Sequence, residues 1–230
     1  MSAVRSIIVL TLLCFAFYGL HFINRFGGGQ IQMEDGGALR LQMGGQSIRS
    51  ARPSVYYPLN WISKDLITAV ILQEDQDFFS HRGYSLDEMA KSLYTYIAAR
   101  GRLRGASTIS QQLARTLFLD REKSARRKFL ELRIARILED TFEKNQILEL
   151  YLNHVYWGKG KSGIAQASFF YFRARPDRLT RYQSAFLVSL LPNPDACPEA
   201  SRCADPRVKR RIERLLRLME KMDSAGAGSR

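Results

Sequence analysis

Residues 126–153 read RRKFLELRIARILEDTFEKNQILELYLN, and this stretch indicates the class of the fold. Apolar side chains recur at every third or fourth position with charged side chains between them, which is the pattern of amphipathic helices that cover a core. The pattern predicts one long helix over residues 123–142 and a second over residues 146–156. Two such helices in succession favour a mainly α-helical domain.

Helical signals continue on both sides of this stretch. Some are apolar periodicities, and others are sequence signatures of helix N-termini, in which a serine, threonine or aspartate side chain accepts from an early backbone amide. The further helices expected on these grounds are 64–74, 107–118, one opened by the capping box Ser85–Glu88, one opened by the capping box Thr180–Gln183, and one opened by Asp205–Pro206.

The N-terminal part of the chain differs in composition. Residues 7–23 are almost all apolar, long enough for a short transmembrane helix, and no small-x-small cleavage site follows them. We therefore expect an uncleaved anchor with its N-terminus in the cytoplasm. The expected organisation is a tail and transmembrane anchor at 1–24, a Gly-rich linker with one short strand (ALRLQM) at 25–60, the main domain at 61–196, and a basic C-terminal extension with an amphipathic helix at 197–230.

The chain of 230 residues carries a net charge of +13, which favours an anionic partner. Nucleic acid, anionic lipid and a phosphorylated substrate all satisfy that charge. Among the three cysteines, Cys14 lies in the apolar segment. Cys197 and Cys203 would close a small disulfide loop in an oxidising compartment, and two free thiols are the alternative.

A group of acids follows the first apolar helix in ILQEDQDFFSHRG, residues 71–83. Glu74 and Asp75 oppose the helix dipole at this C-terminal end, which costs some stability. The neighbouring Phe78 would partly desolvate a carboxylate and raise its pKa toward the range of a general base. A solvated helix end is the alternative, and His81 alone adds little.

Two further segments carry candidate site residues. Glu131 shares a helix face with apolar residues, where a carboxylate is costly unless Arg127 and Lys128 pair with it. Such a carboxylate is either a structural clasp or a site residue. In GASTISQQLAR, residues 105–115, a helix start followed by amides and a cation favours anions, although an ordinary capped helix has the same pattern.

Together these segments resemble glycosyltransferase family 51, the peptidoglycan glycosyltransferase domain of class A penicillin-binding proteins and of monofunctional enzymes. The resemblance covers roughly residues 60–195, and no transpeptidase follows, which favours the monofunctional type. The stretches that carry it are EDQDFFSHRG (74–83), GASTISQQLARTLFL (105–119), RRKFLELRIARILEDTFEKNQILELYLN (126–153), GIAQASFFYF (163–172) and LTRYQSAFLVSLLPNP (179–194).

The resemblance implies a lysozyme-like α-helical fold on a single-pass anchor in the bacterial inner membrane, with a periplasmic domain that polymerises lipid II. It implies that Glu74 is the general base and that Glu131 is a second essential acid near the donor diphosphate. Glu131 is also the candidate ligand for Mg²⁺ or Mn²⁺, and no tightly bound cofactor is expected. The implied substrate-binding residues are Asp75, Phe78, His81, Ser107, Thr108, Gln111, Gln112, Arg115, Arg127 and Lys128.

Some positions depart from the family pattern, and they bear on rate and substrate tolerance more than on the reaction. The expected partners are lipid II, the growing glycan and membrane lipids, with penicillin-binding proteins and the divisome or elongasome as further candidates. A non-catalytic scaffold that binds lipid II is the main alternative, and a nucleic-acid binder is disfavoured by the anchor. The departing positions are Ser85, Thr116, Ala165, Ala174 and Gln183.

Overall fold

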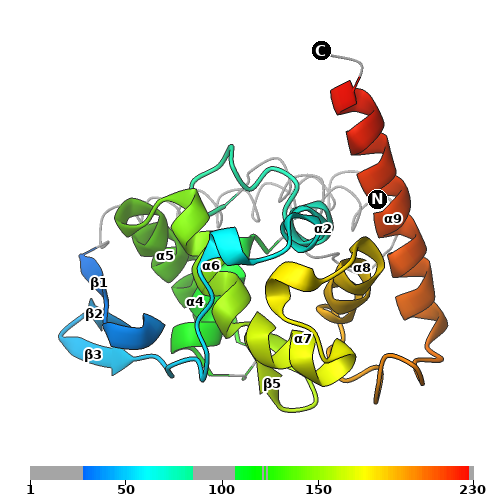
Figure 1. Ribbon diagram of the computed structural model, residues 1–230. Coiled ribbons are helices and arrows are strands. Elements are labelled where there is room, and N and C mark those ends of the chain that lie inside the picture. Colours follow the sequence, from blue (N-terminus) through cyan, green and yellow to red (C-terminus); the bar gives the residue numbers. More distant parts are fainter. Residues whose placement is uncertain (1–27, 85–106, 121, 123, 228–230) are drawn as a thin grey trace, which may run out of the picture.

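The computed structural model describes residues 28–84, 107–120, 122 and 124–227, and this part of the chain is mainly helical (Figure 1). The expected anchor at 7–23 and the expected capping box at Ser85–Glu88 lie outside the described residues. Within them, no helix is both long enough and apolar enough to cross a bilayer. The helices are α2 (Lys64–Glu74), α4 (Ile109–Phe118), α5 (Ala125–Thr141), α6 (Lys144–His154), α7 (Ile164–Phe172), α8 (Arg181–Leu190) and α9 (Pro206–Ala227).

The helix boundaries follow their capping residues. The Thr108 hydroxyl accepts from the amide of Gln111, so α4 begins after Thr108. Glu143 and Gln146 form a reciprocal capping box, which starts α6 two residues before the expected position. The expected capping box of Thr180 is confirmed and opens α8.

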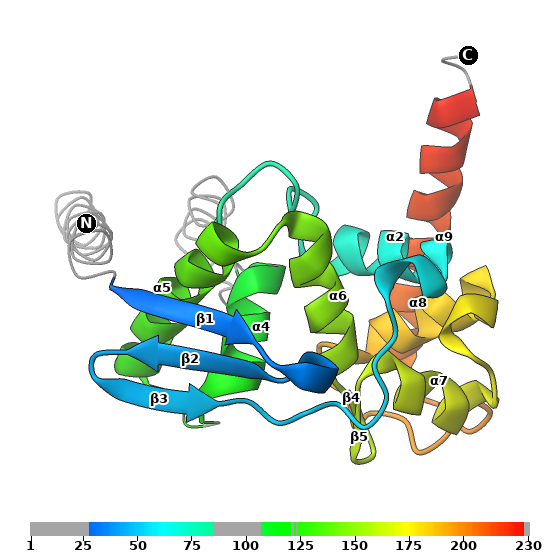
Figure 2. The same ribbon diagram turned by 60° about the vertical axis from the view of Figure 1, so that its left-hand side comes forward.

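Residues 28–60 differ from the expected linker. They form a three-stranded antiparallel sheet of β1 (Gly29–Met33), β2 (Leu39–Met43) and β3 (Gln46–Arg49), in that order. The expected strand is β2, whereas β1 and β3 were missed. Gly44 and Gly45 both have positive φ and join β2 to β3 in a two-residue hairpin. The sheet buries Ile31, Leu39 and Leu41 and lies beside α5 (Figure 2).

The segment after the sheet is held along α6 by polar side chains. Glu149 accepts from the Tyr56 hydroxyl at 2.7 Å and from the amide of Leu59 at 2.6 Å. The Asn153 side chain accepts from the amide of Tyr57 and donates to the carbonyl oxygen of Tyr57, each at 2.8 Å. Because these bonds cross about ninety residues of sequence, the sheet and the segment that follows it belong to the same folded unit as the helices.

The C-terminal region is also part of that unit and not a separate extension. Helix α9 packs against α8 and α2, and it buries Val208, Ile212, Leu215 and Met219. A disulfide joins Cys197 to Cys203 in the loop before α9. This is the pairing that we expected for an oxidising compartment. The far end of α9 stands clear of the body (Figures 1 and 2).

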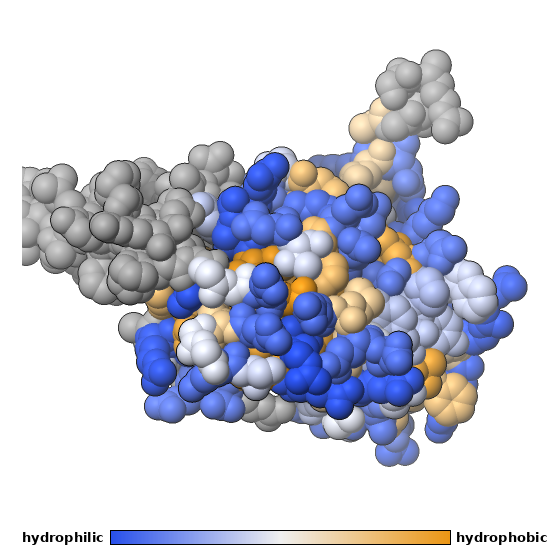
Figure 3. All heavy atoms as spheres, turned by 90° about the vertical axis from the view of Figure 1, so that its left-hand side faces the viewer, coloured by the Kyte–Doolittle hydropathy of each residue, from blue (hydrophilic) through white to orange (hydrophobic). Residues whose placement is uncertain are grey.

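A second hairpin, β4 (Tyr156–Gly158) and β5 (Lys161–Ser162), lies between α6 and α7 and was not expected from the sequence. Gly158 has φ of 97°, and a Cβ there would lie 1.9 Å from the carbonyl oxygen of Pro194, so only glycine fits. The face shown in Figure 3 is mostly hydrophilic, with hydrophobic side chains visible between the charged ones. The buried apolar side chains of the three-stranded sheet and of the helices form one hydrophobic core.

Candidate active site

Glu74 ends α2 and reaches the side chain of Gln112 on α4. The Gln112 amide nitrogen donates to a Glu74 carboxylate oxygen at 2.9 Å, and the Gln112 amide oxygen accepts from the Tyr151 hydroxyl at 3.1 Å. Tyr151 is fully buried in α6. The Tyr151 hydroxyl orients the Gln112 side-chain amide, and the amide in turn orients the Glu74 carboxylate.

The surroundings of Glu74 favour proton uptake. Burial is the main cause that raises the pKa of Glu74, and the adjacent Asp75 adds to it. The hydrogen bond from Gln112 and the charges of Arg211 and Arg115 oppose the shift without cancelling it. A carboxylate whose pKa is raised in this way is a stronger base than an ordinary glutamate, which is what a general base requires.

Asp75 points away from that site and ties three segments together. Its carboxylate accepts from His81 Nε2 at 2.9 Å and from the amide of Ile109, the first residue of α4, at 3.0 Å. Asp75 is buried, and the His81 side chain is only 8% exposed. These surroundings support a positioning role, in which the two residues hold the C-terminus of α2 against α4.

Phe78 and Thr108 are held in the same way. Phe78 is fully buried, and the Lys144 ammonium lies 4.5 Å from its ring centroid. The Thr108 hydroxyl donates to the carbonyl oxygen of Gly83 at 2.8 Å. The expectation that Asp75, Phe78, His81 and Thr108 contact substrate therefore receives no support from their surroundings, which show contacts within the protein.

Glu131 lies on α5 in a cluster of cations. Its side chain is 1% exposed and pairs with Arg127, one turn earlier on the helix. Lys128 Nζ lies 3.1 Å from the second carboxylate oxygen, and Arg115 of α4 approaches the first at 3.9 Å. The spacing on α5 produces the first two contacts, as the sequence predicted. One buried carboxylate thus holds three cations together.

Lys128 connects this cluster to the start of α4. Its ammonium donates to Ser107 Oγ and Gln111 Oε1, both at 2.8 Å, besides Glu131. These three acceptors satisfy its three N–H groups. The guanidinium of Arg127 differs, because its Nε is buried and has no hydrogen-bond partner among the described atoms. An unpaired buried donor beside other cations suits an anionic oxygen from outside the protein.

Gln111 and Gln112 are neighbours on α4 but serve different carboxylates. Gln111 contacts Lys128 of the Glu131 cluster and also donates to the carbonyl oxygen of Gly83 at 3.1 Å. Gln112 contacts Glu74. Adjacent residues of a helix point in directions about 100° apart, so one turn of α4 positions both candidate acids.

Arg211 is a residue of this region that the sequence analysis missed. It comes from α9, where its Nη1 donates to the carbonyl oxygen of Ser189 at 3.0 Å. Burial lowers its pKa, and the charge of Glu74 acts in the opposite direction, so the two groups lie close enough to interact. No local pattern marks this arginine among the many others of α9, because its role depends on where the helix packs.

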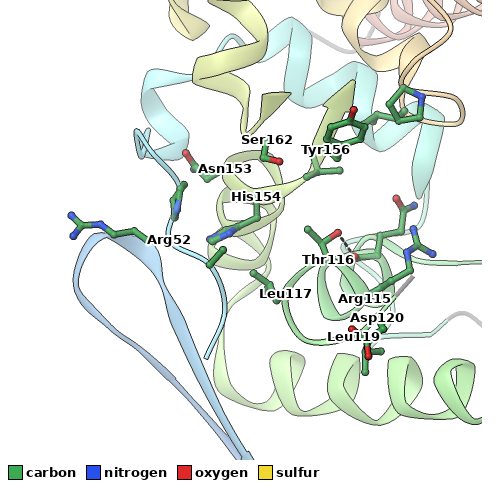
Figure 4. Close-up of a pocket in the computed structure, with 16 residues that line it drawn as sticks. Arg52, Arg115, Thr116, Leu117, Leu119, Asp120, Asn153, His154, Tyr156 and Ser162 are labelled. Atoms are coloured by element: carbon green, nitrogen blue, oxygen red, sulfur yellow. Dashed lines mark hydrogen bonds between the residues drawn. The ribbon is translucent and has the colours of Figure 1, made fainter. Parts of the chain in front are cut away.

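A pocket of about 490 Å³ adjoins the site. Arg115 and Thr116 face it from α4, and Asn153 and His154 from the end of α6 (Figure 4). Gln112 also lines it, so the pocket borders the contacts of both carboxylates. The remaining lining residues are Ala51, Arg52, Pro53, Leu117, Leu119, Asp120, Val155, Tyr156, Ser162, Leu191 and Pro194.

The residues around Glu131 do not fit a metal ion held by the protein. Mg²⁺ and Mn²⁺ require several oxygen ligands, whereas the nearest groups to Glu131 are the cations of Arg127, Lys128 and Arg115. No group of three or more His, Cys, Asp or Glu side chains is arranged for metal binding in the described part of the chain. The chemistry of this cluster suits an anion.

Two of the departures from the family pattern, Thr116 and Gln183, make local hydrogen bonds. The Thr116 hydroxyl donates to the carbonyl oxygen of Gln112 in its own helix, at 2.8 Å. Gln183 accepts from the amide of Thr180 at 2.9 Å and completes the capping box. Ala165 lies in the first turn of α7, and Ala174 follows its end. Ser85 lies outside the described residues.

Comparison with known proteins identifies the family. The sequence model of the transglycosylase family matches residues 43–220. This chain belongs to the transglycosylase family. The matched region includes β3 and most of α9.

Individual relatives agree with the family match. A protein of Cupriavidus pinatubonensis is 42% identical over 159 residues, covering 69% of this chain and 63% of the relative. One from Paraburkholderia xenovorans is 44% identical over 140 residues, covering 60% and 58%. A third, from Burkholderia thailandensis, is 39% identical over 181 residues, covering 76% and 70%. Each is named biosynthetic peptidoglycan transglycosylase. The chain thus spans less than two thirds of the length of the first two.

Proposed function

We propose that this protein is a peptidoglycan glycosyltransferase that polymerises lipid II. The donor is the growing glycan on its undecaprenyl diphosphate, and the acceptor is the 4-hydroxyl of an incoming lipid II. The observation that carries the proposal is that two glutamates in different surroundings, the half-buried Glu74 and the buried Glu131, contact side chains of α4. The family membership and the names of the relatives support the same reaction.

Glu74 acts at the acceptor. Its carboxylate takes the proton of the 4-hydroxyl while that oxygen attacks the anomeric carbon of the donor. The raised pKa of Glu74 makes this transfer easier. Gln112 holds the carboxylate in one orientation and cannot itself remove a proton, so it is a positioning residue.

The cations around Glu131 act on the leaving group. As the bond from the anomeric carbon to the diphosphate oxygen breaks, negative charge develops on that diphosphate. Arg115 and Arg127 present guanidinium N–H groups for it, and Glu131 keeps these like charges close together. The lining of the adjacent pocket, with hydroxyl, amide and aromatic groups, suits the saccharide part of a substrate.

The test is polymer formation from fluorescent lipid II by purified full-length protein. We expect glycan polymers that lysozyme digests. A folded protein that binds lipid II and forms no polymer under any divalent-cation condition would contradict the proposal and favour the scaffold alternative.

We further propose that residues 7–23 anchor the protein in the inner membrane with the folded domain in the periplasm. The length and composition of this segment support the proposal, and so does the disulfide between Cys197 and Cys203, because such bonds persist in oxidising compartments. Alkaline phosphatase fused to the C-terminus should be active in cells. An inactive phosphatase fusion together with a fluorescent cytoplasmic fusion would show the opposite topology.

A further inference from the structure

Helix α9 carries a row of cations along one side. Arg207, Arg210, Arg214, Arg217 and Lys221 follow one another at intervals of three or four residues. This spacing places them on successive turns of the same face. We call these five residues the basic stripe, and all of them are exposed.

The basic stripe is largely uncompensated by acids. Arg207 pairs with Asp205 at 2.8 Å. Arg214 makes a long polar contact of 3.4 Å with the amide oxygen of Gln73 and pairs with no carboxylate in the described part of the chain. Within the described part of the chain, Arg210, Arg217 and Lys221 pair with no carboxylate. Exposed like charges on one face repel one another, so the stripe costs stability that an anionic partner would restore.

The other sides of α9 have different compositions. Glu213 and Glu220 lie roughly a quarter turn from the stripe, given about 100° per residue. Between the stripe and the buried side lie the half-buried Leu218 and the 52% exposed Met222. A helix with a cationic face and an adjoining apolar edge is built to lie at the surface of an anionic bilayer.

The position of the stripe is consistent with that partner. Arg214 contacts Gln73, the residue before Glu74, and Arg211 lies on the flank of the stripe near Glu74. The basic stripe therefore passes close to Glu74. Since the proposed substrate keeps its lipid in the membrane, a membrane contact at this place would bring Glu74 close to the headgroups.

We infer that α9 docks on anionic phospholipid headgroups through the basic stripe, with Leu218 and Met222 at the headgroup boundary. This inference rests on the proposed function for its choice of a bilayer over other anions. It predicts an interaction that depends on lipid charge and on salt. Residues 7–23 are kept in every sample, so the expected difference between samples is confined to α9.

The experiment is amide hydrogen exchange of the full-length protein in nanodiscs. One set contains phosphatidylcholine alone, and the other contains phosphatidylglycerol mixed with it. We expect slower exchange over residues 212–225 in the anionic discs, with α6 unchanged, and loss of that difference in 0.5 M salt. Equal exchange of α9 in the two sets of discs would overturn the inference.

Matched variants test the stripe itself. The triple variant Arg210→Gln, Arg217→Gln and Lys221→Gln removes three stripe charges, and Arg175→Gln, Arg178→Gln and Arg202→Gln removes three exposed charges elsewhere. At about fivefold for each cation, the first should lower the docked-to-undocked ratio roughly 100-fold and the second should leave it unchanged. Equal loss in both would mean that net charge alone acts.

Two further measurements keep the result interpretable. If the first triple variant is less stable than wild type, a second triple variant that keeps all three positive charges (Arg210→Lys, Arg217→Lys, Lys221→Arg) should retain docking. Double-stranded DNA that slows exchange of α9 as strongly as anionic discs would contradict a lipid partner. Because exchange is measured without turnover, a protein that docks and does not polymerise lipid II would keep this inference and reject the proposed reaction.

Discussion

Glu74 and Glu131 both contact side chains of α4, but their neighbours differ in kind. Glu74 has a neutral amide as its direct partner, and burial raises its pKa. Glu131 is more deeply buried and lies among three cations. The first arrangement leaves the carboxylate able to accept a proton. The second commits the carboxylate to holding cations in place.

Under the proposed function, this difference would let a single residue type serve the two ends of a transfer reaction. A base needs a carboxylate that is not neutralised by a full ion pair, whereas a leaving diphosphate needs positive charge that is already assembled. Removing either carboxylate should stop turnover, but for different reasons, and measurements other than turnover should separate them.

The largest effect is expected from Glu74→Gln. The amide keeps the shape of the side chain and cannot take a proton, so polymerisation should fall by about 10²–10⁴-fold. Lipid II binding and the circular dichroism spectrum should stay close to wild type. Near-normal polymerisation by this variant would remove Glu74 from the role of base. Asp75→Asn is the informative control, because it should lower the melting temperature by releasing His81 and α4.

Glu131→Gln should also reduce polymerisation, by roughly 10²-fold, because the cations then repel one another and lose their arrangement. Loss of one partner of a fully buried pair costs about 3–5 kcal/mol. Lys128 and Arg115 are 44% and 41% exposed, so solvent should reduce that cost and most of the melting temperature should survive. A large drop in melting temperature with normal activity per folded molecule would identify Glu131 as a clasp only.

The contribution of Glu74 to stability should depend on pH. The folded-state pKa of Glu74 is raised, so its contribution to stability is fully present below the unfolded pKa and is lost as pH rises through the folded value. Glu74→Gln removes that loss. We expect the variant to melt at a higher temperature than wild type near pH 8, with the gain shrinking toward pH 4. Calorimetry across this range checks the sign, and a gain that grows at low pH would contradict it.

Tyr151→Phe should have the smallest effect of the four. It removes the hydroxyl that orients the Gln112 amide and leaves the ring in the core. A neutral hydrogen bond contributes about 0.5–1.5 kcal/mol, so turnover should fall by at most about tenfold. Gln112→Leu should have a larger effect than Tyr151→Phe. The reverse order would show that Tyr151 acts on Glu74 by a route other than Gln112.

The sequence predicted those parts of the fold whose signals are local. Helix α2 has the expected bounds, the capping box of Thr180 opens α8, and the spacing of Arg127, Lys128 and Glu131 on α5 produced the expected contacts. Each depends only on residues a few positions apart. The Gly44–Gly45 pair was also a local signal for a hairpin, and it was overlooked because β1 and β3 are short and weakly apolar.

Features that depend on distant contacts were not predicted. Nothing near Arg211 in the sequence indicates that α9 brings it beside Glu74. The family resemblance implied substrate contacts for Asp75 and His81, and these contacts remain a prediction. The chain turns between Glu74 and Asp75, so the two side chains serve different partners. Which side of a helix end faces the cleft is decided by packing, and periodicity does not report it.

The paired glutamines of α4 bear on how the enzyme would respond to inhibitors. Gln111 is engaged by Gly83 and Lys128, and Gln112 by Glu74 and Tyr151. Gln111 is 1% exposed, whereas Gln112 lines the adjacent pocket, so a compound bound there would reach Gln112. A substitution of Gln112 that released the compound would also disturb Glu74, so under the proposed function resistance at this position should carry a growth defect.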